Sequence, residues 1–256
     1  MPNYLAISCT TILIAVFILA AVVCINKWRI LWAMFAIGGL LYLMQPYSKT
    51  DLSLPTQHRL LWYNVHLNNP DALGESQLIL AQQADVLALA EINFNNPDWQ
   101  KLHQHYPHGC AHQEYSPFAL AVLSKHPLTI CKVHFIGEFP YIHAQYGNTT
   151  LFALHPPPPI NAALAQARHN YFTQLIPLIQ ANPRVLVVGD FNSSPFSPLF
   201  RQFLQHSQLK QHAPLYQATW RPLMLNIDPI LSKNRNIHSH ALPFHASDHR
   251  ALVANW

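Results

Sequence analysis

VLVVGDFN, at residues 185–192, is the clearest structural signal in this chain. Its four leading residues are apolar and mostly β-branched, which predicts a buried strand, and Gly189 frees the backbone where that strand ends. Asp190 and Asn192 lie two residues apart, so both side chains point to the same side of an extended chain. Two interpretations stay open: a carboxylate and an amide presented for chemistry at the rim of a sheet, or a strand that simply ends in an Asx turn.

Charged residues are scarce in this chain. Of 256 residues, 50% are hydrophobic and only 10% are charged, against about 25% charged in an ordinary soluble domain. The 17 histidines make the protein more cationic below about pH 6.5. The formal net charge is +4, and ten Lys/Arg stand against four acids from Lys125 onward. This balance suits an anionic substrate such as a phosphate ester, and it equally fits a merely basic surface.

Several enzyme classes are disfavoured because their motifs do not occur. The sequence has no His-Glu-x-x-His, no P-loop and no Gly-rich dinucleotide motif. A zinc hydrolase built on the many histidines lacks any spaced ligand motif. Cys110 and Cys131 are isolated, and whether they pair in an oxidising compartment is left open by the sequence.

Two apolar runs near the N-terminus predict a transmembrane helical hairpin. The first, residues 4–25, has the length of about 20 residues that a bilayer requires, and the second, residues 30–44, is shorter. Lys27 and Arg29 lie in the turn between them, which places that turn in the cytoplasm and the main domain outside. A cleaved signal peptide is the alternative, and a single span would leave the domain in the cytoplasm.

The predicted organisation is a membrane anchor over residues 1–46, a linker over 47–57 and one catalytic domain over 58–256. Apolar runs with strand character alternate with helical patterns throughout this last part, which predicts an α/β domain. Strands are expected at 59–66, 85–91, 118–124, 130–136, 149–154, 185–189, 226–231 and 250–256, and helices at 70–83, 161–180 and 197–205.

Polar residues end or interrupt most of these predicted strands. Each alone often caps a strand for local reasons, but their recurrence after separate apolar runs predicts a shared site. Oxygen ligands without cysteine suit a hard divalent cation, Mg²⁺ or Mn²⁺, and such a site favours phosphoryl chemistry. The residues are Asn64, Glu91, His155, Asp190, Asn192, Asp228, Asp248 and His249.

In this setting the motifs resemble the endonuclease/exonuclease/phosphatase superfamily, which includes deoxyribonuclease-I-like nucleases, inositol phosphatases and sphingomyelinases. Gly-Asp-Phe-Asn followed about 55 residues later by Ser-Asp-His is the most specific part of the resemblance. Ala218-Thr219-Trp220 and the N-terminal apolar segment look like the bacterial membrane-anchored branch. The other matching pieces are Asn64, Ala90-Glu91, residues 121–128 (AVLSKHPL), Leu154-His155-Pro156 and Ile227-Asp228.

The resemblance implies a sandwich of two β-sheets flanked by helices in four layers, preceded by the transmembrane hairpin. It also implies a phosphodiesterase or nuclease at a bacterial inner membrane, with its domain on the periplasmic side. Nucleic acid, a phospholipid of sphingomyelin type and a phosphomonoester are open as substrates. The alternative is a catalytically inactive, membrane-anchored binding domain.

Site roles follow from the resemblance. Glu91 is expected to be the main metal ligand, helped by Asn64 and Asp248. Asp190 is expected to orient and deprotonate the attacking water, with Asn192 holding the phosphate or Asp190 itself.

Two histidines complete the expected site. His249 would donate to the phosphate, oriented by Asp228, and His155 would contact the phosphate from the opposite side. The sequence departs from the family at Pro229, where His is frequent, and at Ala90, where Gln is common. Neither departure removes a catalytic group, so an active enzyme is expected.

Overall fold

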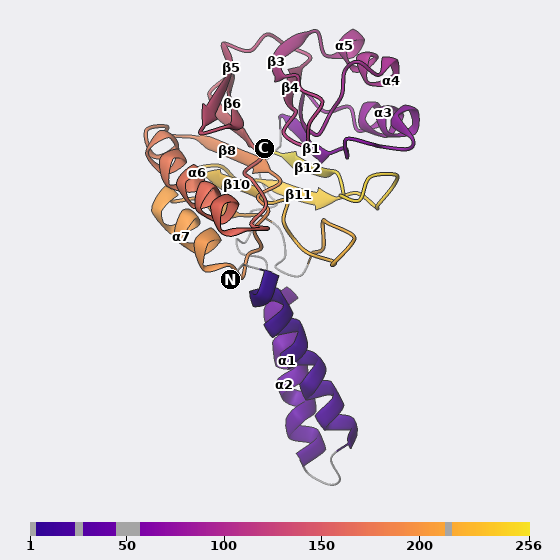
Figure 1. Cartoon of the computed structure of the whole chain (residues 1–256), viewed down its shortest axis with the longest axis vertical. Helices are drawn as coiled ribbons and strands as arrows, with labels where there is room; N and C mark the ends of the chain where they lie inside the picture. Colours follow the sequence, from indigo (N-terminus) through magenta and orange to yellow (C-terminus); the bar gives the residue numbers. More distant parts are fainter. Residues whose placement is uncertain (1–3, 24–27, 45–56, 213–216) are drawn as a thin grey trace.

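Two six-stranded β-sheets pack face to face in the computed structural model, which describes residues 4–23, 28–44, 57–212 and 217–256 (Figure 1). The first sheet contains β1 (Arg59–Asn64), β2 (Val86–Ala90), β3 (His108–His112), β4 (Leu120–Ser124), β11 (His238–Ala241) and β12 (Leu252–Asn255). The second contains β5 (Ile130–Ile136), β6 (Phe139–Tyr146), β7 (Thr149–Leu154), β8 (Val185–Gly189), β9 (Lys210–Gln211) and β10 (Ile230–Lys233). The strand orders are β11-β12-β1-β2-β4-β3 and β5-β6-β7-β8-β10-β9.

Each sheet has one parallel pair of strands at its centre. β1 runs parallel to β2, with Asn64 beside Ala90, and β7 runs parallel to β8, with Leu154 beside Gly189. A β-carbon at residue 189 would lie 2.3 Å from the carbonyl oxygen of Leu154, so only glycine fits this position. Since parallel strands end at the same edge, the residues that follow these four strands are brought close together.

Helices cover the outer face of each sheet and complete a four-layer sandwich. The inner faces form one apolar core between the sheets, with Trp62 and Val188 on opposite sides. The first sheet is covered by α3 (Ala72–Ala81), α4 (Pro97–Gln100) and α5 (Leu102–His105), and the second by α6 (Ala162–Gln180) and α7 (Pro198–Ser207). The predicted two-sheet sandwich flanked by helices is therefore confirmed.

The N-terminal prediction is corrected by the structure. α1 (Tyr4–Val23) and α2 (Trp28–Met44) form a helical hairpin, in which a β-carbon at Gly39 would lie 3.2 Å from Ile14. Among the residues that the structure describes, however, none of the helices combines the length and apolar character needed to cross a membrane. With 17 residues, α2 is about 26 Å long, shorter than a hydrocarbon layer of about 30 Å. The predicted transmembrane anchor and the predicted periplasmic location at a bacterial inner membrane are therefore wrong.

The predicted and observed boundaries of helices and strands agree where a cap or a long apolar run marks them. The helix expected from residue 161 starts at Ala162, because the Asn161 side chain accepts a hydrogen bond from the Leu164 N–H and caps it. β6 and β11 were not predicted, since Pro140 and several histidines interrupt their alternation. The proposed boundaries of the linker stay predictions, because residues 45–56 lie outside the described residues.

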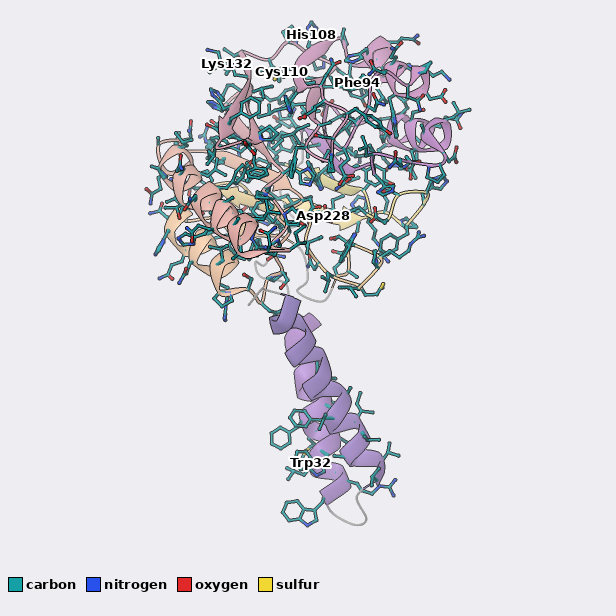
Figure 2. All side chains as sticks on the ribbon, viewed as in Figure 1. Trp32, Phe94, His108, Cys110, Lys132 and Asp228 are labelled. Atoms are coloured by element: carbon teal, nitrogen blue, oxygen red, sulfur yellow. A yellow bond between two sulfur atoms is a disulfide. The ribbon has the colours of Figure 1, made fainter. Side chains whose placement is uncertain are left out.

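Cys110 and Cys131 form a disulfide, which answers a question the sequence left open. Cys110 lies on β3 and Cys131 on β5, the edge strands of the two sheets. Figure 2 shows Cys110 at the rim of the sandwich, away from Asp228 at its middle. The bond therefore joins the two sheets covalently at one edge.

Candidate active site

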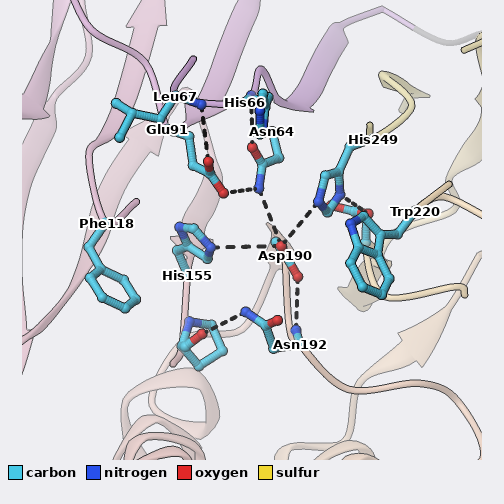
Figure 3. Close-up of polar contacts among 12 residues, drawn as sticks. Asn64, His66, Leu67, Glu91, Phe118, His155, Asp190, Asn192, Trp220 and His249 are labelled. Carbon is cyan, nitrogen blue, oxygen red and sulfur yellow. Dashed lines mark hydrogen bonds and ion pairs between the residues drawn. The ribbon is translucent and has the colours of Figure 1, made fainter. Parts of the chain in front are cut away.

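The strand ends of both sheets meet at one edge of the sandwich (Figure 3). Asn64 ends β1 and Glu91 follows β2, while His155 follows β7 and Asp190 follows β8. Strand β8 packs against β1 and β2 of the facing sheet. Side chains as far apart in sequence as Asn64 and Asp190, separated by 126 positions, are thereby in hydrogen-bond contact.

Asp190 is the centre of this cluster. Its Oδ1 accepts a hydrogen bond of 2.9 Å from the Asn192 N–H, which is the Asx turn considered from the sequence. Its Oδ2 accepts from Asn64 Nδ2 at 3.3 Å and lies 3.6 Å from His249 Nε2 and 3.7 Å from His155 Nε2. The Asx turn is therefore present, since one oxygen of Asp190 fixes it, and the other oxygen faces Asn64, His155 and His249.

Glu91 is tied to Asn64 and to the loop after β1. Its Oε1 accepts from Asn64 Nδ2 at 2.8 Å, and its Oε2 accepts from the Leu67 N–H at 3.1 Å. Glu91 and Asn192 both have positive φ values, 58° and 47°. Such backbone costs about 1–3 kcal/mol for residues other than glycine and is often found at functional sites.

A second buried network fixes His249. Its Nδ1 lies 2.8 Å from Asp228 Oδ2, which also accepts from the Thr219 hydroxyl at 2.6 Å. The other oxygen of Asp228 accepts from the indole N–H of Trp62 at 3.0 Å. Trp62 and Thr219 had no role assigned from the sequence, because a tryptophan inside a buried strand looks like an ordinary core residue.

Asn192 is held by Pro156 and by Arg168 on α6, and His155 packs against Phe118. Asn192 Nδ2 donates to the Pro156 carbonyl at 3.1 Å, and its own carbonyl accepts from the buried guanidinium of Arg168. The ring of His155 lies 5.6 Å from that of Phe118. These contacts leave His155 Nε2 directed at Asp190.

Burial and neighbouring charges shift the pKa values of Asp190, His249 and His155 in different directions. Burial raises the pKa of Asp190 to about 7, against the opposing charge of His249. Burial works against a charge on His249, but Asp228 and Asp190 outweigh it and raise the His249 pKa to about 10. Burial lowers the pKa of His155. At neutral pH, Asp190 is therefore close to its titration point, His249 is a cationic donor and His155 is neutral.

The donor set fits a divalent cation. Asp248 Oδ2 accepts from the Trp220 indole at 2.9 Å, and Asp248 Oδ1 lies 3.4 Å from His66 Nδ1. Within the described part of the chain, this buried Oδ1 accepts no hydrogen bond, which leaves its lone pairs free for a cation. His66 links Asp248 to Asn64, because its backbone N–H also donates to Asn64 Oδ1 at 3.1 Å.

A different trio also satisfies simple metal geometry. Among the described residues, Asp190, Asp228 and His249 offer ligand atoms within 4.8 Å of one another. Their hydrogen bonds indicate another use, because His249 Nδ1 is already engaged by Asp228. The trio is therefore linked internally by a hydrogen bond, separately from the oxygen atoms of Glu91.

The fold and site define a deoxyribonuclease-I-like class, and comparisons with known proteins agree. The sequence profile of the Endonuclease/Exonuclease/phosphatase family matches residues 61–249. This match covers most of the chain, so the protein belongs to the Endonuclease/Exonuclease/phosphatase family. No curated protein sequence matches it.

Solved structures share the fold at low sequence identity. Sphingomyelinase C from Streptomyces griseocarneus is 17% identical with a TM-score of 0.55, and the match covers 79% of this chain and 99% of that one. A Staphylococcus aureus beta toxin mutant with bound magnesium ions is 14% identical with a TM-score of 0.59, covering 78% and 99%. A humanized D. rerio TDP2 is 12% identical with a TM-score of 0.58, covering 77% and 98%. These likenesses support the fold alone.

Proposed function

We propose that this protein is a divalent-metal-dependent hydrolase of phosphate esters, in which Asp190 activates the attacking water. The main support is a set of contacts to Asp190 Oδ2: Asn64 Nδ2, His155 Nε2 and His249 Nε2 all lie within 3.7 Å of it. A buried carboxylate whose pKa is raised to about 7 can hold or accept a proton near neutral pH. The family's phosphoester chemistry supports the same assignment.

His249 and His155 lie on either side of Asp190 and are the natural contacts for a phosphate group. His249 donates from Nε2, because Asp228 holds its Nδ1 and keeps the ring charged. His155 is a neutral partner on the opposite side. Asn192 holds Asp190 through its backbone N–H.

Glu91, Asn64 and Asp248 are the proposed ligands of the metal, with Mg²⁺ or Mn²⁺ favoured by their oxygen atoms. A bound divalent ion would neutralise charge that develops on the phosphoryl oxygens. Asn64 would offer its amide oxygen, which accepts a hydrogen bond from the His66 N–H.

The substrate is proposed only at the level of a phosphate ester. Nucleic acid and a phosphodiester lipid are the two main candidates, since one structurally similar protein is named for sphingomyelin and the family includes nucleases. A phosphomonoester is the third. The surface charge does not separate them, because a net charge of +4 suits any anionic substrate.

An activity screen of the purified protein tests the proposal. DNA, RNA, sphingomyelin, phosphatidylcholine and bis(p-nitrophenyl) phosphate are incubated with Mg²⁺ or Mn²⁺ and, in parallel, with EDTA. We expect metal-dependent cleavage of at least one substrate, and a loss of about a thousandfold in Asp190→Asn. Glu91→Gln should require more metal for half-maximal activity.

Asp98→Asn is the matched control, because Asp98 forms an ion pair with Lys101 on α4 and should leave the rate unchanged. Cleavage by Asp190→Asn at the wild-type rate would overturn the assignment. Calorimetry with Mg²⁺ and Mn²⁺ addresses the alternative of an inactive binding domain, which predicts no binding of either ion and no cleavage.

A further inference from the structure

Glu75 is a fully buried carboxylate outside the cluster described above. It lies in the first turn of α3, and none of its side chain reaches solvent. Burying a charged group without partners is strongly unfavourable, so its contacts should indicate its role. Its sequence position gives no sign of this burial, since a glutamate near a helix N-terminus is ordinary on a surface helix.

Four donor groups converge on one oxygen of Glu75. Its Oε1 accepts from the Tyr63 hydroxyl at 2.7 Å, from the Ser247 N–H at 2.8 Å and from the Ala246 N–H at 2.9 Å. His245 Nδ1 lies 3.4 Å from the same atom. Successive backbone N–H groups that face one carboxylate form charge-assisted hydrogen bonds, which are stronger than neutral ones.

Three of these donors, on His245, Ala246 and Ser247, belong to the segment that carries two site residues. Ala246 and Ser247 directly precede Asp248 and His249. The Ser247 hydroxyl donates to the Asn64 carbonyl at 2.8 Å and accepts from the His249 N–H at 3.0 Å. Residues 245–249 are therefore fixed on one side by Glu75 and on the other by the end of β1.

We propose that Glu75 is a positioning residue: by holding residues 245–249 against β1, it sets where Asp248 and His249 stand relative to Asp190. This inference rests on the proposed function. Tyr63 adds a link within the same arrangement, since it precedes Asn64 on β1 and donates to Glu75. A single carboxylate on α3 thus couples the proposed metal ligands Asn64 and Asp248 to the proposed phosphate donor.

Glu75→Gln is the decisive variant. Its amide oxygen can still accept hydrogen bonds, but the negative charge is lost, and the amide nitrogen takes the place of Oε2. Among the described residues Oε2 has no hydrogen-bond partner, so the new N–H groups would be buried unpaired. We expect kcat for bis(p-nitrophenyl) phosphate to fall about tenfold with KM within about twofold, since small displacements of catalytic groups cost rate.

Two further readouts separate positioning from simple destabilisation. The Mg²⁺ concentration for half-maximal activity should rise in Glu75→Gln, because Asp248 is displaced. Hydrogen exchange at the Ala246 and Ser247 amides should accelerate by about tenfold or more, since they lose a charged acceptor. The matched control is Asp71→Ala, which removes the α3 cap, where Asp71 Oδ1 accepts from the Gly74 N–H, without touching residues 245–249. It should lower the melting temperature and leave kcat, the Mg²⁺ requirement and both amides unchanged.

Unchanged kcat and Mg²⁺ requirement in folded Glu75→Gln would overturn the proposal, as would equal losses in Asp71→Ala. If Glu75→Gln does not fold, Tyr63→Phe serves instead, because it removes one donor to Glu75 and should raise the Mg²⁺ requirement in the same direction. Failure of the proposed function is recognised separately: wild-type protein would then show no Asp190-dependent cleavage. The role of Glu75 in catalysis would fall with it, while the exchange rates would still report the contact.

Discussion

Asp228 shows how much one residue depends on distant partners. Its carboxylate is completely buried and receives hydrogen bonds from Trp62, Thr219 and His249. Each partner lies on a different segment, and Trp62 reaches it across the core between the two sheets. A buried carboxylate held by several donors keeps a fixed orientation, which lets it orient His249.

We expect Trp62→Phe to lower kcat by about five- to tenfold and the free energy of unfolding by about 1–3 kcal/mol, because Asp228 loses a buried donor. Urea unfolding and metal-dependent phosphodiester cleavage measure the two effects. Trp99→Phe is the matched control, since Trp99 is equally buried but packs on the outer face of the first sheet. It should lower stability and leave kcat intact. An equal kcat in both variants would contradict the role of Trp62.

At the scale of elements, the close approach of β7 and β8 determines where Asp190 stands. A β-carbon at residue 189 would lie 2.3 Å from the Leu154 carbonyl oxygen. We expect Gly189→Ala to lower the free energy of unfolding by about 2–3 kcal/mol, because backbone atoms must separate to make room. It should also reduce activity by displacing Asp190. Urea unfolding checks the first effect, and a change below about 0.5 kcal/mol would show that the pair tolerates the methyl group.

The edge formed by β9 and β10 contains a histidine that resists protonation. His212 Nε2 lies 2.6 Å from the Ser232 hydroxyl. Burial, helped by the charges of Lys210 and His238, lowers the pKa of His212 from 6.5 to about 4. In the unfolded chain this residue titrates at its ordinary value, so the unfolded state binds more protons between about pH 4 and pH 6.5.

The free energy of unfolding should therefore fall as pH decreases from about 6.5 to about 4, by up to about 3 kcal/mol from this residue. Burial also lowers the pKa of His155, which therefore contributes with the same sign, whereas the pKa of His249 is raised and its contribution has the opposite sign. The difference between wild type and His212→Gln isolates the contribution of His212. His206→Gln, at an exposed position on α7, is the control. Urea unfolding at pH 4.5, 5.5 and 7 measures the effect. Parallel pH profiles for wild type and His212→Gln would refute it.

For the whole molecule, the contact between the two sheets is reinforced by the disulfide from β3 to β5. The bond closes a loop between residues 21 positions apart and ties the sheets at one edge. Loops of this length give a stabilisation of about 2–4 kcal/mol. The proposed active site lies at the ends of the central strands, so the bond is expected to support the fold more than the chemistry.

We expect reduction, or the double variant Cys110→Ser/Cys131→Ser, to lower the free energy of unfolding by about 2–4 kcal/mol. Activity at temperatures well below the melting point should change little. Urea unfolding with and without dithiothreitol measures the loss, and the double variant should not respond to the reductant. Equal stability of oxidised and reduced protein would mean that packing alone holds the sheets together.

By itself, the sequence determined the alternation of strands and helices and the residues that end the central strands. These features depend on local signals: apolar runs, caps such as Asn161 and the Gly-Asp-Phe-Asn turn. The sandwich architecture was implied by the resemblance of the motifs to a known superfamily. Local signals were weaker where strands were short or contained proline and histidine, so β6 and β11 were missed. Counting apolar residues in the N-terminal runs also predicted membrane spans that the helices of the described chain do not provide.

Only the tertiary structure decided which side chains meet. The indole of Trp62 binds a carboxylate 166 positions away, and Glu75 binds amides 171 and 172 positions away. It also paired Cys110 with Cys131 and brought His155 and His249 to opposite sides of Asp190. Hydrogen bonds act over about 3 Å, so they depend on strand register and on how the two sheets pack. Neither is recorded in the neighbouring residues of any one segment.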